Sequence, residues 1–498
     1  MAPARAAEAN RKVAVIVGTW SGFAAIGLHA GAFGPTLPAL AARADVPEDR
    51  MSMSFLLAGI AAALCTPAVG ALADHMGTRK ALRRLLGGAL LADACSAALQ
   101  TRFAVMVQPW NNQLSLLPLA FLWGVSGIAI STVISVGNAT AVALYPGAEE
   151  EPPLDAPATR RRSTADDAAP SGPKADALYA SLAALGCGYS IGNALATAGA
   201  GDAGVAVLDQ AAAVLAISGC LAVGLPGLLP DDVAEPAAAD VDGDDEATQP
   251  LLEAADDNEA TSVVGTTIAV FATLSSARID LRLALSLVFN AMVVGCEIAF
   301  GSWVGTLSEH ACGATPQLAG TLGSSFWIAY TFGRIVFLGA AVFGASPWVA
   351  LVCAYPPLLA GLGIATSVLW DAAAWERMDL VGGQCAPVFL AAGLYGLGRS
   401  AGFISMCAIV GKRCGSDGKR TSAAATEQAL VGCAGSVGAA AIPCLVGALG
   451  GASGHLVGKS LILCLLSATA IEITAFTVLA SIGIDLPRAA RSRAGSLA

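Results

Sequence analysis

Apolar runs of about 20 residues recur along nearly the whole chain, each long enough to cross the roughly 30 Å hydrocarbon core of a bilayer. Polar breaks separate twelve such runs. Of the 498 residues, 55% are hydrophobic and only 13% are charged, whereas roughly a quarter of the residues of a soluble protein are charged. The runs exclude a soluble globule and predict an all-α integral membrane protein that crosses the bilayer many times.

The runs fall into two sets of six, with a long polar segment between them. The first set covers residues 13–33, 52–73, 82–100, 116–144, 177–200 and 205–229. The second set covers residues 281–307, 317–341, 347–370, 386–410, 421–450 and 456–484. The stretch 263–274 is too short to span and is expected to form a surface helix that leads into the second set. Two six-helix bundles, over 13–229 and 263–484, are therefore predicted.

Two polar inserts, 146–175 and 230–262, interrupt this pattern. Their Ala, Pro, Asp, Glu and Ser composition buries too little apolar area to fold, so both are expected to be disordered. Residues 231–260 carry twelve acids and no Lys or Arg, and without these acids the net charge of -10 would be +2. The acidity thus belongs to a solvated spacer and gives no reason to expect a nucleic-acid partner.

Basic residues predict the orientation of the chain. With the tails 1–12 and 485–498 in the cytoplasm, cytoplasmic segments hold 20 Lys or Arg, outer loops hold five, and two lie within spans. Because cytoplasmic loops carry the excess of basic residues in membrane proteins, both inserts are placed on that side too. The plasma membrane and an internal membrane both fit this topology.

Thirteen cysteines are scattered, mostly within the apolar runs. They show no CxxC and no Cys/His ligand spacing, so neither a metal nor another cofactor is expected, and they are interpreted as small core residues. Cys312 and Cys385 fall near two predicted outer loops. A disulfide between them is the alternative.

A charged stretch, GALADHMGTRK (70–80), lies between the second and third runs. Its basic residues are placed to anchor helix ends against an anionic leaflet. The G-x-x-x-D-x-x-G spacing of Gly70, Asp74 and Gly77 suggests a tight reversal, with an acid that caps a helix or pairs with an arginine.

This stretch resembles the G-x-L-A-D-x-x-G-x-[RK]-[RK] signature between the second and third helices of the major facilitator superfamily. The matching residues are Gly70, Leu72, Ala73, Asp74, Gly77, Arg79 and Lys80. Only the basic residue that usually follows the aspartate differs, being His75 here. Two sets of six spans agree with that family's architecture. The resemblance implies that the motif helps to hold the cytoplasmic gate and does not touch substrate; the alternative is a basic loop with an incidental aspartate.

Four further pieces resemble the fucose-permease-like branch of that family, which includes the sodium-dependent glucose transporter-like proteins of animals. Span seven, VVGCEIAFGSWVGTL, is similar to V-G-x-E-x-x-x-G-x-W at Gly295, Glu297, Gly301 and Trp303. Span eight, SSFWIAYTFGRIV, is similar to F-W-x-x-x-x-x-G-R at Phe326, Trp327, Gly333 and Arg334. Spans four and eleven add Asn138, Pro146 and Pro443. The resemblance implies transport of a sugar.

One departure concerns coupling to protons. Sugar/proton permeases of this branch have an acid in span four, four residues before the asparagine, and another acid in span one. The first position is Ile134 here, and span one contains only His29. His29 is a candidate proton carrier because imidazole titrates near neutrality; the alternative is a hydrogen bond between helices. Coupling to H⁺ or Na⁺ and uncoupled transport thus all stay open.

Charged residues within the spans are informative because a charge at bilayer depth costs at least a few kcal/mol unless it faces a partner, a cavity or water. They are Asp93, Glu297, Arg334, Arg399, Glu427 and Glu472. Glu297 and Arg334 lie on consecutive spans and together would provide an ion site and a gate, or else a structural pair that binds nothing. Arg399 would either favour an anionic ligand or snorkel.

Sugar recognition needs aromatic faces for stacking and amides that both donate and accept hydrogen bonds. The core spans supply Trp20, Trp123, Asn138, Asn193, Asn290, Trp303 and Trp327, with packing as the alternative role of each tryptophan. The predicted solute- or ion-binding residues are Glu297, Arg334, Asn138, Asn290, Trp303, Trp327 and His29.

The sequence contains no P-loop, H-E-x-x-H or G-x-S-x-G, so neither an ATP-driven pump of that type nor an enzyme is expected. We expect a monomeric alternating-access transporter of a small polar solute, with a hexose-type sugar as the first choice. A carrier of another small metabolite or organic anion, a non-transporting membrane sensor and a channel are the alternatives.

Overall fold

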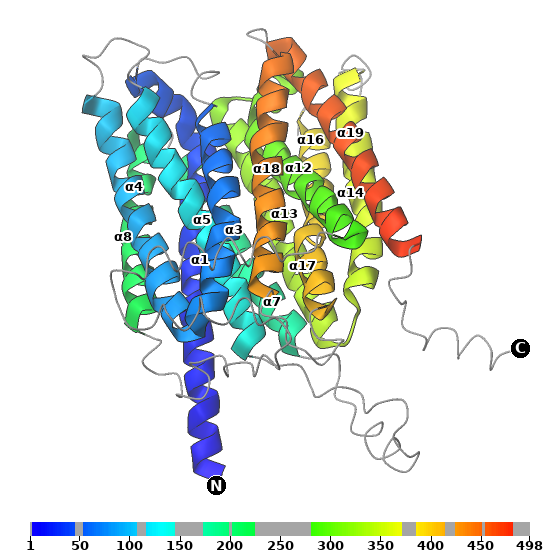
Figure 1. Cartoon of the computed structure of the whole chain (residues 1–498). Coiled ribbons are helices and arrows are strands. Elements are labelled where there is room, and N and C mark those ends of the chain that lie inside the picture. The colour runs from blue at the N-terminus through cyan, green and yellow to red at the C-terminus, as the bar shows by residue number, and fades with distance from the viewer. Residues whose placement is uncertain are drawn as a thin grey trace, which may run out of the picture.

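The computed structural model consists almost entirely of helices that run side by side (Figure 1). It describes residues 2–44, 53–106, 116–144, 173–198, 202–224, 280–370, 385–413, 424–450 and 454–481. The helices of the first half, coloured blue to green, lie together, and those of the second half, green to red, lie beside them (Figure 1).

Each half contributes six membrane-crossing segments. The first half has α1 (Ala2–Ala44), α3 (Met53–Lys80), α4 (Gly87–Met106), α5 (Leu116–Leu144), α7 (Pro173–Ala198) and α8 (Asp202–Gly224). The second has α12 (Leu281–Cys312), α13 (Pro316–Val342), α14 (Pro347–Trp370), α16 (Ala386–Arg399) with α17 (Gly402–Arg413), α18 (Ala424–Gly450) and α19 (Gly454–Ser481). A two-residue turn separates α16 from α17 within one span. The predicted all-α architecture of twelve spans is confirmed.

Ten of the described segments are long and apolar enough to cross a membrane by themselves. The other two, α4 and α7, are more polar; α4 packs against α5 and α8, and α7 packs against α1 and α13. Asp93 and Gln100 of α4 and Asn193 of α7 are buried against neighbouring helices, which is where a membrane protein places polar residues.

The helix pairing of the first half is repeated in the second. α1 packs against α7 and α8, and correspondingly α12 packs against α18 and α19. The pairs α3–α5 and α13–α16 match in the same way. The two halves meet where α3 lies against α18 and where α7 lies against α13, another matched pair of contacts. The chain is therefore built from two structural repeats, an arrangement in which a ligand site lies between the repeats.

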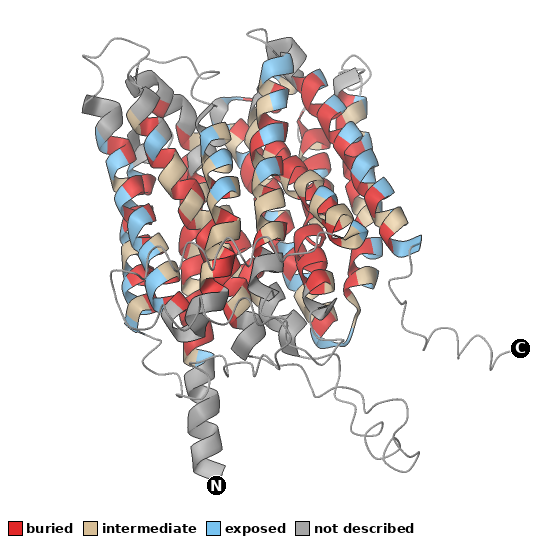
Figure 2. Cartoon of the chain, viewed as in Figure 1, coloured by how far each residue is buried: buried red, intermediate tan, exposed pale blue. Residues whose placement is uncertain are grey.

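Large apolar residues lie on the outside of the bundle as well as in its interior, and Figure 2 shows exposed positions on many of the helices. Leu64, Phe121 and Phe343 are among the exposed ones, at 75%, 72% and 91%. Lipid tails are as apolar as leucine, so such residues are stable on a surface that faces lipid and do not by themselves drive helices together. Close packing of small residues has to supply much of the attraction.

Glycines allow the backbones of paired helices to touch. A Cβ added to Gly188 of α7 would lie 2.1 Å from the Ala24 carbonyl oxygen of α1, and one added to Gly192 would lie 2.1 Å from that of Leu28. In the second half, a Cβ on Gly438 of α18 would lie 1.8 Å from the Ala291 carbonyl of α12. Glycines thus allow close backbone packing in both matched pairs, α1–α7 and α12–α18.

The charged stretch 70–80 is helical in the structure and does not reverse. α3 continues to Lys80 and passes directly into a π-helical segment, η1 (Ala81–Leu86), followed by α4. The predicted tight reversal at Gly70–Gly77 is wrong because the strong helix formers around the two glycines keep the backbone helical. The side chains of 74–80 lie outside the described residues, so the gating role of Asp74, Arg79 and Lys80 stays a prediction.

Other expected segments differ in how far they are described. α1 begins at Ala2, so the predicted tail 1–12 continues the first helix, which extends beyond the bundle (Figure 1). The linker 230–262, the surface helix 263–274 and the tail 485–498 lie outside the described residues, as does the insert 146–175 up to the start of α7. Glu427 lies in α18, but its side chain is not among those described.

A disulfide joins Cys312, the last residue of α12, to Cys385 just before α16, with 5.5 Å between their Cα atoms. The interpretation of every cysteine as a reduced core residue is wrong for this pair, because both residues lie at helix ends that the fold brings together. The predicted orientation places the bond on the outer side of the membrane, where disulfides persist.

Adding one methyl group at Gly188 should separate α1 from α7. We expect Gly188→Ala to cost about 1–3 kcal/mol, the usual price of overpacking, and to lower the melting temperature of the detergent-purified protein. Gly393→Ala in α16 is the matched control, because its Cβ would meet no atom within 4 Å. Equal melting temperatures for the two variants would contradict a role of Gly188 in the close packing of α1 against α7.

Candidate functional site

A cavity of about 150 Å³ lies between the two halves. Four helices of the first half line it, namely α1, α3, α5 and α7, together with α12, α13 and α18 of the second half. It therefore occupies the place in which two repeats can enclose a solute.

Aromatic rings from both halves form the walls of this cavity. Tyr189 of α7 stacks on Trp327 of α13, with ring centroids 4.5 Å apart and an angle of 17° between the planes. Trp123 of α5 and His29 of α1 form a second parallel pair at 6.1 Å and 21°. All four residues line the cavity.

Hydroxyl and amide groups supply the polar part of the lining. Asn193 lines the cavity, and its Oδ1 accepts a hydrogen bond of 2.9 Å from Ser324, across the boundary between the halves. Ser131 and Ser436 also bridge the two halves, at 3.1 Å. No Lys, Arg, Asp or Glu is among the lining residues that the structure describes.

The predicted pair Glu297 and Arg334 is brought together, with 4.0 Å between Oε1 and Nη2 and with both side chains buried. The Arg334 guanidinium also donates to the Tyr330 hydroxyl and to the Leu182 carbonyl of α7. Since Arg334 belongs to α13, its bond to Leu182 crosses from the second half to the first.

Neither Glu297 nor Arg334 is among the described residues that line the cavity. Tyr189 connects the two sites, because its ring lines the cavity while its hydroxyl lies within electrostatic range of both charges. A change at this ion pair can therefore reach the cavity through one aromatic side chain.

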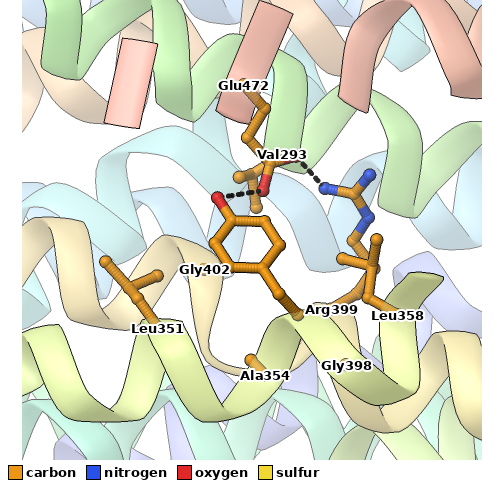
Figure 3. A pocket seen from close by; sticks show the side chains of 9 residues that line it. Val293, Leu351, Ala354, Leu358, Gly398, Arg399, Gly402 and Glu472 are labelled. Carbon is orange, nitrogen blue, oxygen red and sulfur yellow. Dashed lines mark hydrogen bonds and ion pairs between the residues drawn. The ribbon is translucent and has the colours of Figure 1, made fainter. Parts of the chain in front are cut away.

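Arg399 and Glu472 form a second buried ion pair, within the second half (Figure 3). Arg399 also donates to the Tyr395 hydroxyl at 3.0 Å and to Thr469 at 2.7 Å. Tyr355 donates to Glu472 at 3.3 Å. The neighbouring hollow measures only about 10 Å³, at the limit for one water molecule. Arg399 is thus paired inside the bundle, and neither snorkelling nor an anionic ligand is needed to explain it.

Three other predicted residues are buried or packed away from the cavity. Asn290 of α12 donates to the Val431 carbonyl of α18 at 3.3 Å. Asn138 is buried in α5, and Trp303 packs beside Gly447, whose added Cβ would lie 3.3 Å from the ring. Of the predicted binding residues, His29 and Trp327 are the two that line the cavity as described.

The sequence did not single out Tyr189 or the serines of the lining, nor the partner of His29. Tyr189 and Asn193 are four residues apart, a spacing that places them on one face of a helix and offered a usable signal. His29 Nδ1 lies 3.0 Å from Asp93 Oδ2 of α4. Because 64 residues separate these two, no local pattern links them.

No protein-family model matches the chain, and no curated protein resembles it in sequence. Solved structures share its fold, and two transporters are among them. The human organic anion transporter MFSD10 (TETRAN) matches with a TM-score of 0.56 at 14% identity, over 94% of this chain and 99% of that one. The nucleoside transporter NupG matches with a TM-score of 0.55 at 14% identity, over the same shares. The predicted major facilitator fold is thereby confirmed, whereas the fucose-permease-like branch stays a prediction.

Removing Arg399 should leave the Glu472 carboxylate buried without its counter-ion. We expect Arg399→Met to destabilise the protein by about 3–5 kcal/mol, and Arg399→Met with Glu472→Leu to recover most of that loss, since an apolar pair replaces a buried ion pair well. Thermal unfolding in detergent measures both, with the exposed Arg84→Met as control. A double variant as unstable as the single one would contradict the pairing.

Proposed function

We propose that the chain is an alternating-access transporter of a small, uncharged polar solute, with a hexose-type sugar as the first candidate. The observation that carries this proposal is the cavity lined by seven helices from two matched halves. Rocking of one half against the other would open such a cavity to each side of the membrane in turn.

The chemistry of the lining supports a sugar. A pyranose ring presents apolar C–H faces to aromatic rings and hydroxyls to amides and serines, and Trp123, Tyr189, Trp327 and Asn193 provide these partners. Sites for small ligands usually combine such aromatic walls with a few placed polar groups. The resemblance of spans seven and eight to the fucose-permease-like branch points in the same direction.

The solutes of the two similar structures differ from a sugar in instructive ways. An organic anion, as carried by MFSD10, would be stabilised by a fixed cation in the cavity, and His29 is the only described lining residue that can become one near neutral pH. A nucleoside, as carried by NupG, combines a flat base with ribose hydroxyls. The stacked Tyr189 and Trp327 make a nucleoside the second candidate.

Contacts between the halves suggest how the movement is controlled. Ser190 and Thr331 hydrogen-bond across the boundary at 2.9 Å, in addition to Asn193 with Ser324. Rocking has to break some of these bonds. When the halves separate, Arg334 would lose its hydrogen bond to the Leu182 carbonyl. Glu297 would still neutralise the guanidinium, because both residues belong to the second half. This difference gives the predicted ion pair a gating role. The signature Gly70, Asp74, Gly77, Arg79 and Lys80 is proposed as a further gate element on the cytoplasmic side.

Counterflow in proteoliposomes tests the transport proposal. Vesicles preloaded with unlabelled D-glucose are diluted into labelled D-glucose, with parallel series for uridine and p-aminohippurate. A carrier for hexoses accumulates label transiently above equilibrium in the glucose series, because unlabelled solute leaves through the same site. Plain equilibration would indicate a channel, and solute binding without flux would indicate a sensor; either result contradicts the proposal.

Asn193→Ala should weaken the interaction with solute. Losing one hydrogen bond worth about 0.5–1.5 kcal/mol is expected to raise the half-saturating solute concentration by about 2- to 10-fold. Asn290→Ala is the matched control, because that amide bonds a backbone carbonyl away from the cavity and should affect stability alone. If Asn193→Ala leaves the half-saturating concentration unchanged and Asn290→Ala alters it, the solute does not bind in this cavity.

A further inference from the structure

His29 and Asp93 form a buried pair at the wall of the central cavity that the recognition of a neutral solute does not require. We propose that this pair is a proton-binding site, and that one proton bound there accompanies the solute in each transport cycle. The coupling part of this inference rests on the proposed transport function, whereas the binding of a proton does not.

The geometry of the pair is that of a hydrogen-bonded imidazole and carboxylate. His29 Nδ1 and Asp93 Oδ2 are 3.0 Å apart, and the two side chains are 1% and 0% exposed. His29 lines the cavity, so the pair connects the α1 wall to α4 behind it. Among the described residues, His29 Nε2 and Asp93 Oδ1 have no hydrogen-bond partner.

The arrangement determines which nitrogen takes the proton. A carboxylate only accepts hydrogen bonds, so Asp93 selects the tautomer whose Nδ1–H donates to it. The lone pair of the neutral ring is then on Nε2, the atom without a described partner. A proton from solvent forms an N–H bond there, which turns the imidazole into an imidazolium while Asp93 stays a carboxylate. No other bond changes, and the proton leaves by the reverse step.

Burial supplies the reason for coupling. The pair has a net charge of minus one before the proton binds and none afterwards, and a net charge inside the membrane is costly unless water reaches it. When the halves close over the cavity and exclude water, the neutral, protonated pair is favoured. Because the halves can close only when the proton is bound, the proton crosses the membrane together with the solute.

Few other ionisable groups face His29. Asp93 is the charged group that α4 presents, together with the uncharged Gln100. From α5 the neighbour is the Trp123 ring, and from α7 Tyr189 lines the same cavity. On α8, the described Asp209 is exposed and accepts a hydrogen bond from Thr101. Asp93 therefore dominates the electrostatics of the imidazole.

A proton fits this site better than a metal cation does. Hard cations require several oxygen ligands at once. One oxygen of Asp93 is already occupied by the imidazole, and the remaining described oxygens without a partner here are Asp93 Oδ1 and Gln100 Oε1. Sodium coupling is accordingly an outcome that the test can detect and that would overturn the proposal.

Nitrogen-15 NMR of the full chain in bilayers tests proton binding without any solute. The sequence holds four histidines, and the signals lost in His29→Gln assign the ring in question. We expect these signals to change from the neutral to the imidazolium pattern between about pH 8 and pH 5, the range in which histidine titrates. Asp93→Asn should alter this change, and the control Asp209→Asn should not. A ring that stays neutral throughout overturns the site.

Uptake driven by an inward proton gradient tests coupling, with labelled D-glucose as the probe. Wild-type protein should accumulate it above equilibrium, whereas His29→Gln, which can still donate to Asp93, should fail to accumulate it. His455→Gln, at the start of α19, should behave as wild type. Accumulation that survives in His29→Gln, or that follows a sodium gradient, overturns the coupling.

Two readouts separate this inference from the transport proposal. If wild-type vesicles show no counterflow of D-glucose, uridine or p-aminohippurate, the transport proposal and the coupling fail, and the NMR titration alone decides whether His29 binds a proton. Monodisperse elution of each variant in detergent confirms that it has folded.

Discussion

A charge inside the bilayer has to find a partner, because lipid offers neither water nor counter-ions. The described part of the membrane region follows this rule with three buried pairs, each of which joins two different helices. The pairs are His29 with Asp93, Glu297 with Arg334, and Arg399 with Glu472.

The positions of these pairs suggest different roles. The Arg399 pair lies within one half, has every neighbour it needs and can move with that half as a rigid body. The Arg334 pair lies at the boundary and shares its guanidinium with the Leu182 carbonyl of the other half. The His29 pair borders the cavity and leaves polar atoms unsatisfied. From the first pair to the third, the pairs lie closer to the boundary and the cavity, and fewer of their polar atoms have hydrogen-bond partners.

Features that depend on neighbouring residues could be predicted from the sequence. Helix positions followed from run length and hydropathy, and Glu297 with Arg334 followed from consecutive antiparallel spans. Features that depend on helix rotation could not be predicted. Nothing local shows that His29 faces Asp93, that Tyr189 rather than Trp303 lines the cavity, or that Asn290 bonds a backbone carbonyl. The mistaken reversal at Gly70–Gly77 has the opposite cause, since a local turn pattern was overridden by the helix around it.

Movement of the two matched bundles about the cavity is tested most directly by distances across their boundary. Spin labels replace exposed residues in pairs, Leu195 with Thr321 near the start of α13 and Arg84 with Phe343 at its other end. Double electron–electron resonance spectroscopy then measures both distances between the labels, with and without the solute identified by counterflow. We expect one distance to grow while the other shrinks. Two distances that stay constant, or that change in the same direction, would contradict it.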